Sequence, residues 1–146
     1  LIVTPAGHGI LVDVGETGFS RSDGARIVGT YVAEVLGCRR LEALVLTHFH
    51  VDHVGVPGHG GAWHLLFEQG FDVAATWTRD RRTIRGRSDA TLRAWDRLLD
   101  GDAARRFRQR VARVGDVLLR EGPLVIRVVA GDGAGVLRAG DHGDDP

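Results

Sequence analysis

The sequence contains no lysine and no methionine, and it has a single cysteine. Because Cys38 has no second thiol to pair with, an internal disulfide and a zinc or redox site built on cysteine pairs are both excluded. No apolar run approaches the roughly 20 residues of a membrane-spanning helix. The 19 basic residues are all arginine, which we interpret as the codon bias of a GC-rich genome.

The length and composition are those of one globular domain. A chain of 146 residues can bury a hydrophobic core, and 43% apolar with 26% charged residues is ordinary for such a protein. The sequence starts at Leu1, inside a strand-like run, and ends abruptly at Pro146. We therefore expect a single domain over residues 1–146 that is truncated at both ends. No secretion signal is visible, which leaves cytoplasmic and secreted locations open, and the oligomeric state is not indicated.

The net charge is zero, but the charges are unevenly spread. Residues 79–113 hold 12 arginines against 5 acidic residues, a balance of +7, and the remainder holds 7 arginines against 14 acidic residues, a balance of −7. Such asymmetry is compatible with a surface for anionic partners. The alternative, which we favour, is that these arginines line the solvated faces of helices.

Hydrophobic periodicity and turn residues predict a chain of the α/β class. Strands alternate with helices in the first half, and the arginine-rich segment carries two helices. The predicted elements are a hairpin over residues 1–14, helices over 25–36 and 62–70, strands over 43–47 and 71–77, helices from 88 or 89 to 101 and from 102 to 115, and a strand, a glycine turn (131–135) and a second strand within 123–140.

The segment "LTHFHVDHVG" places four potential metal ligands directly after the predicted strand "ALVLT". Imidazoles two residues apart on an extended segment point the same way, so His48 and His50 can share one metal ion. Asp52 and His53 follow as the chain turns and can face a second ion. Imidazole and carboxylate together suit Zn²⁺, and also Fe or Mn. The alternatives are a structural metal site or a solvated histidine-rich turn.

Two motifs in this order resemble the metallo-β-lactamase fold superfamily of hydrolases. The strand "GHGILVDVGE" is similar to the first motif of that family, and "RLEALVLTHFHVDHVG" is similar to its metal-binding motif. The resemblance covers residues 1 to about 70 well and the rest loosely. It implies a four-layer αββα sandwich with two metals between its sheets, of which this chain supplies the N-terminal part.

The resemblance also implies a role for each matching residue. His48 and His50 correspond to ligands of the first metal, and Asp52 and His53 to ligands of the second. Asp52 is further implied as the catalytic carboxylate that accepts a hydrogen bond from the bridging water. Asp13 corresponds to an aspartate that orders the metal loop without binding the metal. Two Zn²⁺ ions are expected in the full-length protein.

The chain departs from the family pattern after this motif. The family also has a later histidine, a bridging aspartate and a last histidine, and no convincing equivalent of these is present. His59, His64 and His142 are candidates by residue type alone; His64 is better interpreted as a packed histidine and His59 as a loop residue or a substrate contact. We expect the missing ligands to follow Pro146, and residues 1–146 alone to be inactive.

The expected function is metal-dependent hydrolysis by a metal-bridged hydroxide. The stretch "LGCRRLEALVLTHFHVDHVG" most resembles the hydrolase domain of competence-type DNA-uptake proteins and their secreted relatives. That resemblance and the arginine excess favour a phosphodiester or nucleic-acid substrate. The alternatives are a small-molecule ester or lactone hydrolase, and a catalytically degenerate metal-binding module.

Overall fold

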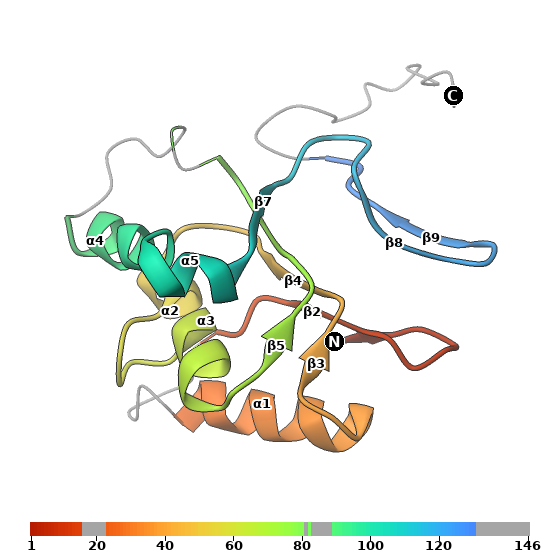
Figure 1. Ribbon diagram of the computed structural model, residues 1–146, viewed down its shortest axis with the longest axis horizontal. Coiled ribbons are helices and arrows are strands. Elements are labelled where there is room, and N and C mark those ends of the chain that lie inside the picture. Colours follow the sequence, from red (N-terminus) through yellow and green to blue (C-terminus); the bar gives the residue numbers. More distant parts are fainter. Residues whose placement is uncertain (16–22, 81, 83–88, 131–146) are drawn as a thin grey trace. The chain divides into compact units, whose positions relative to one another are not determined.

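The computed structural model describes residues 1–15, 23–80, 82 and 89–130 (Figure 1). The chain divides into two compact units, Leu1–Val111 and Ala112–Pro146. Within the described residues no helix is both long enough and apolar enough to cross a membrane. The predicted glycine turn, the strand after it and His142 lie outside the described residues.

A five-stranded mixed sheet organises the first unit, which agrees with the predicted α/β class. Its strand order is β1-β2-β4-β6-β7. The edge strand β1 is antiparallel to β2, as the predicted hairpin requires, and the other pairs are parallel. The strands are β1 (Ile2–Val3), β2 (Gly9–Val12), β4 (Ala43–Leu46), β6 (Thr76–Thr78) and β7 (Gln109–Val111).

A second, two-stranded parallel sheet pairs β3 (Arg40–Leu41) with β5 (Asp72–Val73). These two strands precede β4 and β6, so the same two chain segments remain paired as they pass from the small sheet into the large one. The strand predicted over residues 71–77 is therefore two short strands, separated at residues 74–75.

The helices follow the predicted pattern in order but not in every boundary. Helices were predicted from Ala25 and from residue 88 or 89, and α1 and α4 occupy these places. The predicted helix over residues 62–70 contains a five-residue π-helix, η1. The helical elements are α1 (Asp23–Leu36), α2 (Val51–Val54), α3 (Gly61–Trp63), η1 (His64–Glu68), α4 (Asp89–Leu98) and α5 (Gly101–Phe107).

The prediction of one helix from residue 102 to 115 is wrong in its second half. Helix α5 ends at Phe107 because Arg108 adopts a left-handed conformation, with φ 48°, that a helix cannot continue. Arg108 is held there by its guanidinium, which donates to Val73 O at 2.7 Å. The chain then runs into strand β7, so Val111, expected on a helix, lies on a strand.

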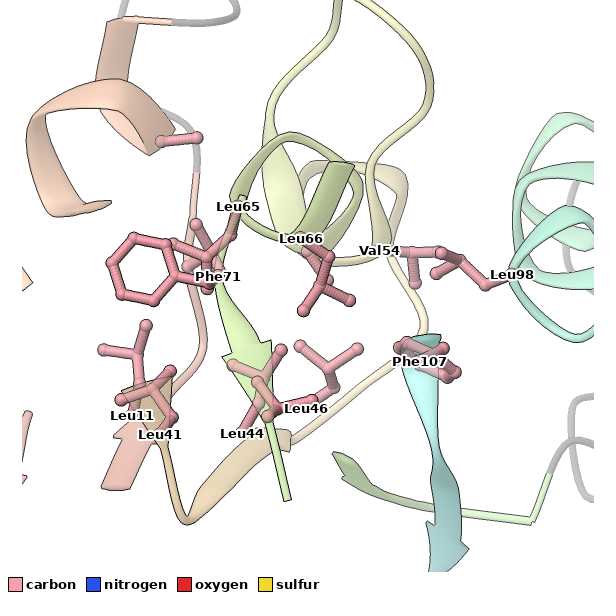
Figure 2. Close-up of a cluster of buried hydrophobic side chains, with 14 of the residues drawn as sticks. Leu11, Leu41, Leu44, Leu46, Val54, Leu65, Leu66, Phe71, Leu98 and Phe107 are labelled. Carbon is pink, nitrogen blue, oxygen red and sulfur yellow. The ribbon is translucent and has the colours of Figure 1, made fainter. Parts of the chain in front are cut away.

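The helices of the first unit bury one face of the sheet (Figure 2). Leu44 of the central strand β4 and Leu11 of β2 lie in one cluster with Leu65 and Leu66 of η1 and Trp95 of α4. All five side chains are at most 4% exposed. A fully buried Leu or Phe contributes roughly 1.5–3 kcal/mol, so this face is the main source of stability and holds β4 rigidly in place.

The described part of the second unit is a β-hairpin. Strand β8 (Val117–Glu121) pairs antiparallel with β9 (Leu124–Arg127) around Gly122, which has φ 55°. Strand β9 lies within the strand predicted from Pro123. The sequence analysis did not predict β8, because the wrongly extended helix reached almost to its start.

Candidate metal centre

Asp13 and the histidine motif meet at the carboxyl edge of the parallel strands. Val12 pairs with Val45 in the β2–β4 ladder, so Asp13 follows β2 beside the end of β4. Thr47 and His48 follow β4 directly. Open α/β sheets place their ligands at this edge, because the strands end there and the connecting chain turns away.

The backbone of Asp13 is strained into position. Its φ is 54°, a left-handed conformation that few residues other than glycine adopt, although aspartate is among those that tolerate it. The amide of Asp13 donates to Val45 O at 2.8 Å. This turn at the strand end directs the carboxylate across to the neighbouring strand, where it meets Thr47.

Thr47 links Asp13 to His48. Its amide donates to Asp13 Oδ1 at 3.0 Å and its hydroxyl to Asp13 Oδ2 at 2.6 Å. The same hydroxyl oxygen lies 2.9 Å from Nδ1 of His48. A hydroxyl has one proton, and that of Thr47 is donated in the hydrogen bond to Asp13. The Nδ1 of His48 must therefore be the donor in its contact with the hydroxyl oxygen. The neutral ring then has its lone pair on Nε2, as a metal ligand requires.

The Asp13, His48 and His53 side chains form the candidate metal group. One ligand atom of each lies within 4.8 Å of the other two. The rings of His48 and His53 are 3.9 Å apart between centroids. An aspartate and two histidines within that distance have the chemistry of a Zn²⁺, Fe or Mn site.

The environment of His53 fits a cation at this position. Its Nδ1 is buried and lies 3.1 Å from Asp13 Oδ1, but it forms no hydrogen bond with any residue that the structure describes. Its Nε2 faces Asp52 Oδ2 at 3.4 Å. A buried ring nitrogen without a hydrogen bond is costly, and a metal ion bound to both this nitrogen and the carboxylate would offset that cost.

His50 and Asp52, the other predicted ligands, lie beside this group and outside it. The His50 ring is edge-on to His48, 4.7 Å between centroids, and its side chain is exposed. Asp52 is 41% exposed on the side chain and contacts His53. The predicted pairs were His48 with His50 and Asp52 with His53, with Asp13 only in support. In the structure the potential ligand atoms that lie close together are those of Asp13, His48 and His53.

The electrostatic environment keeps His48 neutral. Partial burial lowers the pKa of His48, and the neighbouring His53 and His50 lower it further, while Asp13 and Asp52 act in the opposite direction. The sum is a lowered pKa, which favours the neutral, ligating form of the imidazole.

The two described histidines that follow the motif, His59 and His64, lie outside the candidate metal group. His64 is 8% exposed and makes a 2.5 Å contact from Nδ1 to Glu68 Oε2, so it is the packed histidine that the sequence analysis favoured. His59 lies in the loop between α2 and α3, outside the candidate metal group.

Thr47 is the functional residue that sequence reasoning missed. It was treated only as the end of a strand, because a lone threonine carries no motif. Its place between a strand and the first histidine was the one available signal.

A comparison with family models, with curated proteins and with solved structures finds no match for this chain.

Proposed function

We propose that this chain forms the metal-binding part of a metal-dependent hydrolase. The observation that carries the proposal is the arrangement of Asp13, His48 and His53 at the carboxyl edge of the sheet, with His53 Nδ1 buried and without a hydrogen bond among the described residues. Their placement after strands β2 and β4 agrees with the resemblance of both motifs to the metallo-β-lactamase superfamily.

Each residue of the centre has an assigned task. His48 and His53, with Asp13, would hold Zn²⁺, and the neighbouring His50 and Asp52 would complete the set of ligands that the resemblance implies. When bound, such a metal polarises a carbonyl or phosphoryl oxygen and lowers the pKa of water. Thr47 fixes the tautomer of His48. Asp52, the most exposed acid of the group, is the carboxylate that we assign to accept a proton or hydrogen bond from the attacking water.

A phosphodiester or nucleic acid is the proposed substrate. The +7 balance over residues 79–113 supports an anionic substrate, and strand β6 brings the first residue of that segment to the same sheet edge as His48. The resemblance to the hydrolase domain of competence-type DNA-uptake proteins favours the same class.

We also propose that a further sheet layer covers the second face, as in an αββα sandwich. One row across the four parallel strands consists of Val12, Val45, Trp77 and Arg110. Val12 is 43% exposed, and Trp77 Nε1 is buried without a hydrogen-bond partner among the described residues. A covering layer would bury the exposed valine of this row and could supply a hydrogen-bond partner for the indole.

Metal analysis and a hydrolysis assay test the proposed function. Protein purified without chelator should contain divalent metal, about two ions per chain in the full-length protein. His48→Ala should lower that content, whereas His8→Ala, a histidine near the opposite edge of the sheet, should not. Hydrolysis of bis(p-nitrophenyl) phosphate by the full-length protein should require the metal. A folded protein that binds no divalent metal would contradict the proposal.

A small-molecule ester or lactone hydrolase is the second candidate, and one observation favours it. A hollow of about 430 Å³ opens beside Asp13, between β2 and α1. Its lining is mostly apolar and includes Leu11, Ile27 and Tyr31. It could receive an acyl or aryl group. Ile27→Glu should then impair hydrolysis of an acyl lactone and leave that of the phosphodiester intact.

A further inference from the structure

The strand β6 delivers an arginine to the sheet edge that carries the candidate metal centre. Leu46 pairs with Thr78 at the end of the β4–β6 ladder, so the next residues of the two strands are Thr47 and Arg79. Neighbouring strands are roughly 5 Å apart. Arg79 therefore leaves the sheet beside the threonine that orients His48, on the side of β4 opposite Asp13.

The side chain of Arg79 is fixed against the histidine motif. Its guanidinium carbon lies 5.7 Å from the centroid of the Phe49 ring, and Phe49 stands between His48 and His50 in the chain. Phe49 is 2% exposed and packs edge-on against Trp95, with ring centroids 4.8 Å apart. A buried ring of this kind is a rigid platform, so the charge of Arg79 has a defined position.

Arg82, the next arginine that the structure describes, differs in its setting. It is 87% exposed on the side chain, and it contacts the Asp80 carboxylate through Nε at 3.2 Å and through a terminal nitrogen at 2.8 Å. The charge of Arg82 is thus largely balanced by Asp80. Arg79 is half-buried at the strand end, and its guanidinium lies over an aromatic ring.

We propose that Arg79 binds the anionic oxygen of a phosphodiester that is presented to the metal centre. A guanidinium offers five N–H donors in a planar fork that matches phosphate, and it keeps its charge while it retains contacts within the chain. Its place beside Thr47 would orient the substrate and reject uncharged esters. This inference rests on the proposed function, because it names the substrate class of that site.

Equilibrium binding of fluorescein-labelled oligothymidylate, followed by anisotropy, tests the proposal without relying on turnover. Arg79→Gln should weaken binding about 10- to 100-fold, the usual scale for a hydrogen bond to a charged group. It should also lower the slope of log affinity against log salt by about 0.7, the value for one phosphate contact on a single strand. Arg79→Lys, which keeps the charge, should retain part of the affinity.

Arg40→Gln is the matched control, because it removes the same charge from an exposed arginine at the amino edge of the sheet, just before β4. It should change affinity less than about twofold if the effect of Arg79 is local. Equal losses in both variants, or no oligothymidylate binding by the folded protein, would overturn the proposal. Thermal unfolding of each variant verifies that the fold is kept.

Two further arms separate this inference from the proposed function and identify the source of the phosphate. Oligothymidylate binding is measured with Zn²⁺ and with EDTA. If the protein neither binds metal nor hydrolyses the diester, but Arg79→Gln still weakens oligothymidylate binding, only the proposed hydrolase function is refuted. Phosphodiester hydrolysis that Arg79→Gln leaves unchanged would refute only the inference. Competition by thymidylyl-thymidine but not by inorganic phosphate would show that a diester is recognised, and competition by inorganic phosphate alone would overturn the assignment.

Discussion

Thr47 determines the chemistry of the candidate centre at the scale of single residues. Its hydroxyl contacts both the Asp13 carboxylate, at 2.6 Å, and the His48 ring, at 2.9 Å. Replacing the hydroxyl by a methyl group of similar size would remove both contacts without opening a cavity. The His48 ring would then be free to rotate and to exchange tautomers, so fewer molecules would present Nε2 to a metal.

We therefore expect Thr47→Val to weaken zinc binding by about 10- to 100-fold while the fold is kept. Thr47→Ser, which retains the hydroxyl, should restore most of the affinity. Competition with a chromogenic chelator measures both constants, and Thr30→Val on the exposed side of α1 is the control. Equal zinc affinity in the Thr47→Val variant and the wild type would show that the contact does not orient His48.

The sequence could predict which residues lie near the candidate metal centre, but not which of them supply ligand atoms and which orient the others. The spacing of His48, His50, Asp52 and His53 is local, so a short motif reveals it. Whether Asp13 supports the site or joins it depends on the direction of its carboxylate. That direction comes from a left-handed backbone and from the register of β2 against β4, which no local pattern contains.

Element η1 braces the loop that follows the histidine motif. Glu68 accepts a hydrogen bond from the Gly58 amide at 2.8 Å with one carboxylate oxygen and contacts His64 with the other. Gln69 Nε2 lies 3.1 Å from His64 Nε2 and 3.4 Å from Ala25 O of α1. The π-helical turn thus connects α1, a buried histidine and the glycine-rich loop after α2.

The contribution of these contacts to the stability of the fold should depend on pH, because Glu68 titrates. The hydrogen bond from Gly58, followed by the contact with His64, holds the pKa of Glu68 below its usual 4.5. A lowered folded-state pKa stabilises the protein above pH 4.5, and that contribution is lost as the pH falls through the folded-state value. Glu68→Gln should therefore unfold at a lower temperature than the wild type at pH 7, and the gap should narrow below pH 4.5.

Thermal unfolding monitored by circular dichroism at pH 7 and at pH 3.5 checks this expectation. Glu34→Gln, at an exposed position of α1, is the control and should show no comparable change. A gap that widens as the pH falls would contradict the assigned role of the carboxylate.

The glycines of this loop have unequal roles, which a pair of substitutions can separate. Gly55 and Gly58 both have positive φ, at 77° and 75°. A Cβ on Gly55 would lie 2.0 Å from Gly60 O, whereas a Cβ on Gly58 meets nothing within 4 Å. Gly58→Ala should cost about 1–2 kcal/mol of strain, and Gly55→Ala roughly 1–3 kcal/mol more from overlap. Urea unfolding measures both, and equal costs would contradict the close approach.

Periodicity predicted α1 and β4 because their apolar residues repeat without interruption. It failed at Arg108, where a contact with a distant strand accompanies the end of helix α5. It also failed at η1, because five residues are too few for periodicity to distinguish a π turn from an α turn. Both failures concern the way a regular element ends or is distorted, which depends on tertiary contacts.

At the scale of the whole molecule, large apolar side chains are exposed on α1 and on the strands β1 and β2. Ile27 and Tyr31 on α1 are 57% and 59% exposed, and Ile2 on β1 and Val12 on β2 are 45% and 43% exposed. Exposed apolar surface beside an edge strand favours association with another chain or layer.

We expect residues 1–146, expressed alone, to self-associate through this surface. Sedimentation velocity at increasing concentration should show species larger than a monomer. The double variant Ile27→Glu and Val12→Thr should shift the distribution toward monomer, whereas Val129→Thr, an exposed valine of the second unit, should not. A wild-type chain that remains monomeric at all concentrations would contradict this expectation.

The hydrogen bonds between Asp13 and Thr47 join segments that lie 34 residues apart in the sequence. A metal ion held at once by Asp13 and His48 would close that stretch, which includes all of α1, into a covalent-like ring. On the chain-entropy estimate used for disulfides, a loop of this size is worth about 4 kcal/mol. A protein whose single thiol cannot form an internal cross-link would thereby gain a reversible one, and its resistance to unfolding and proteolysis would rise and fall with the supply of zinc.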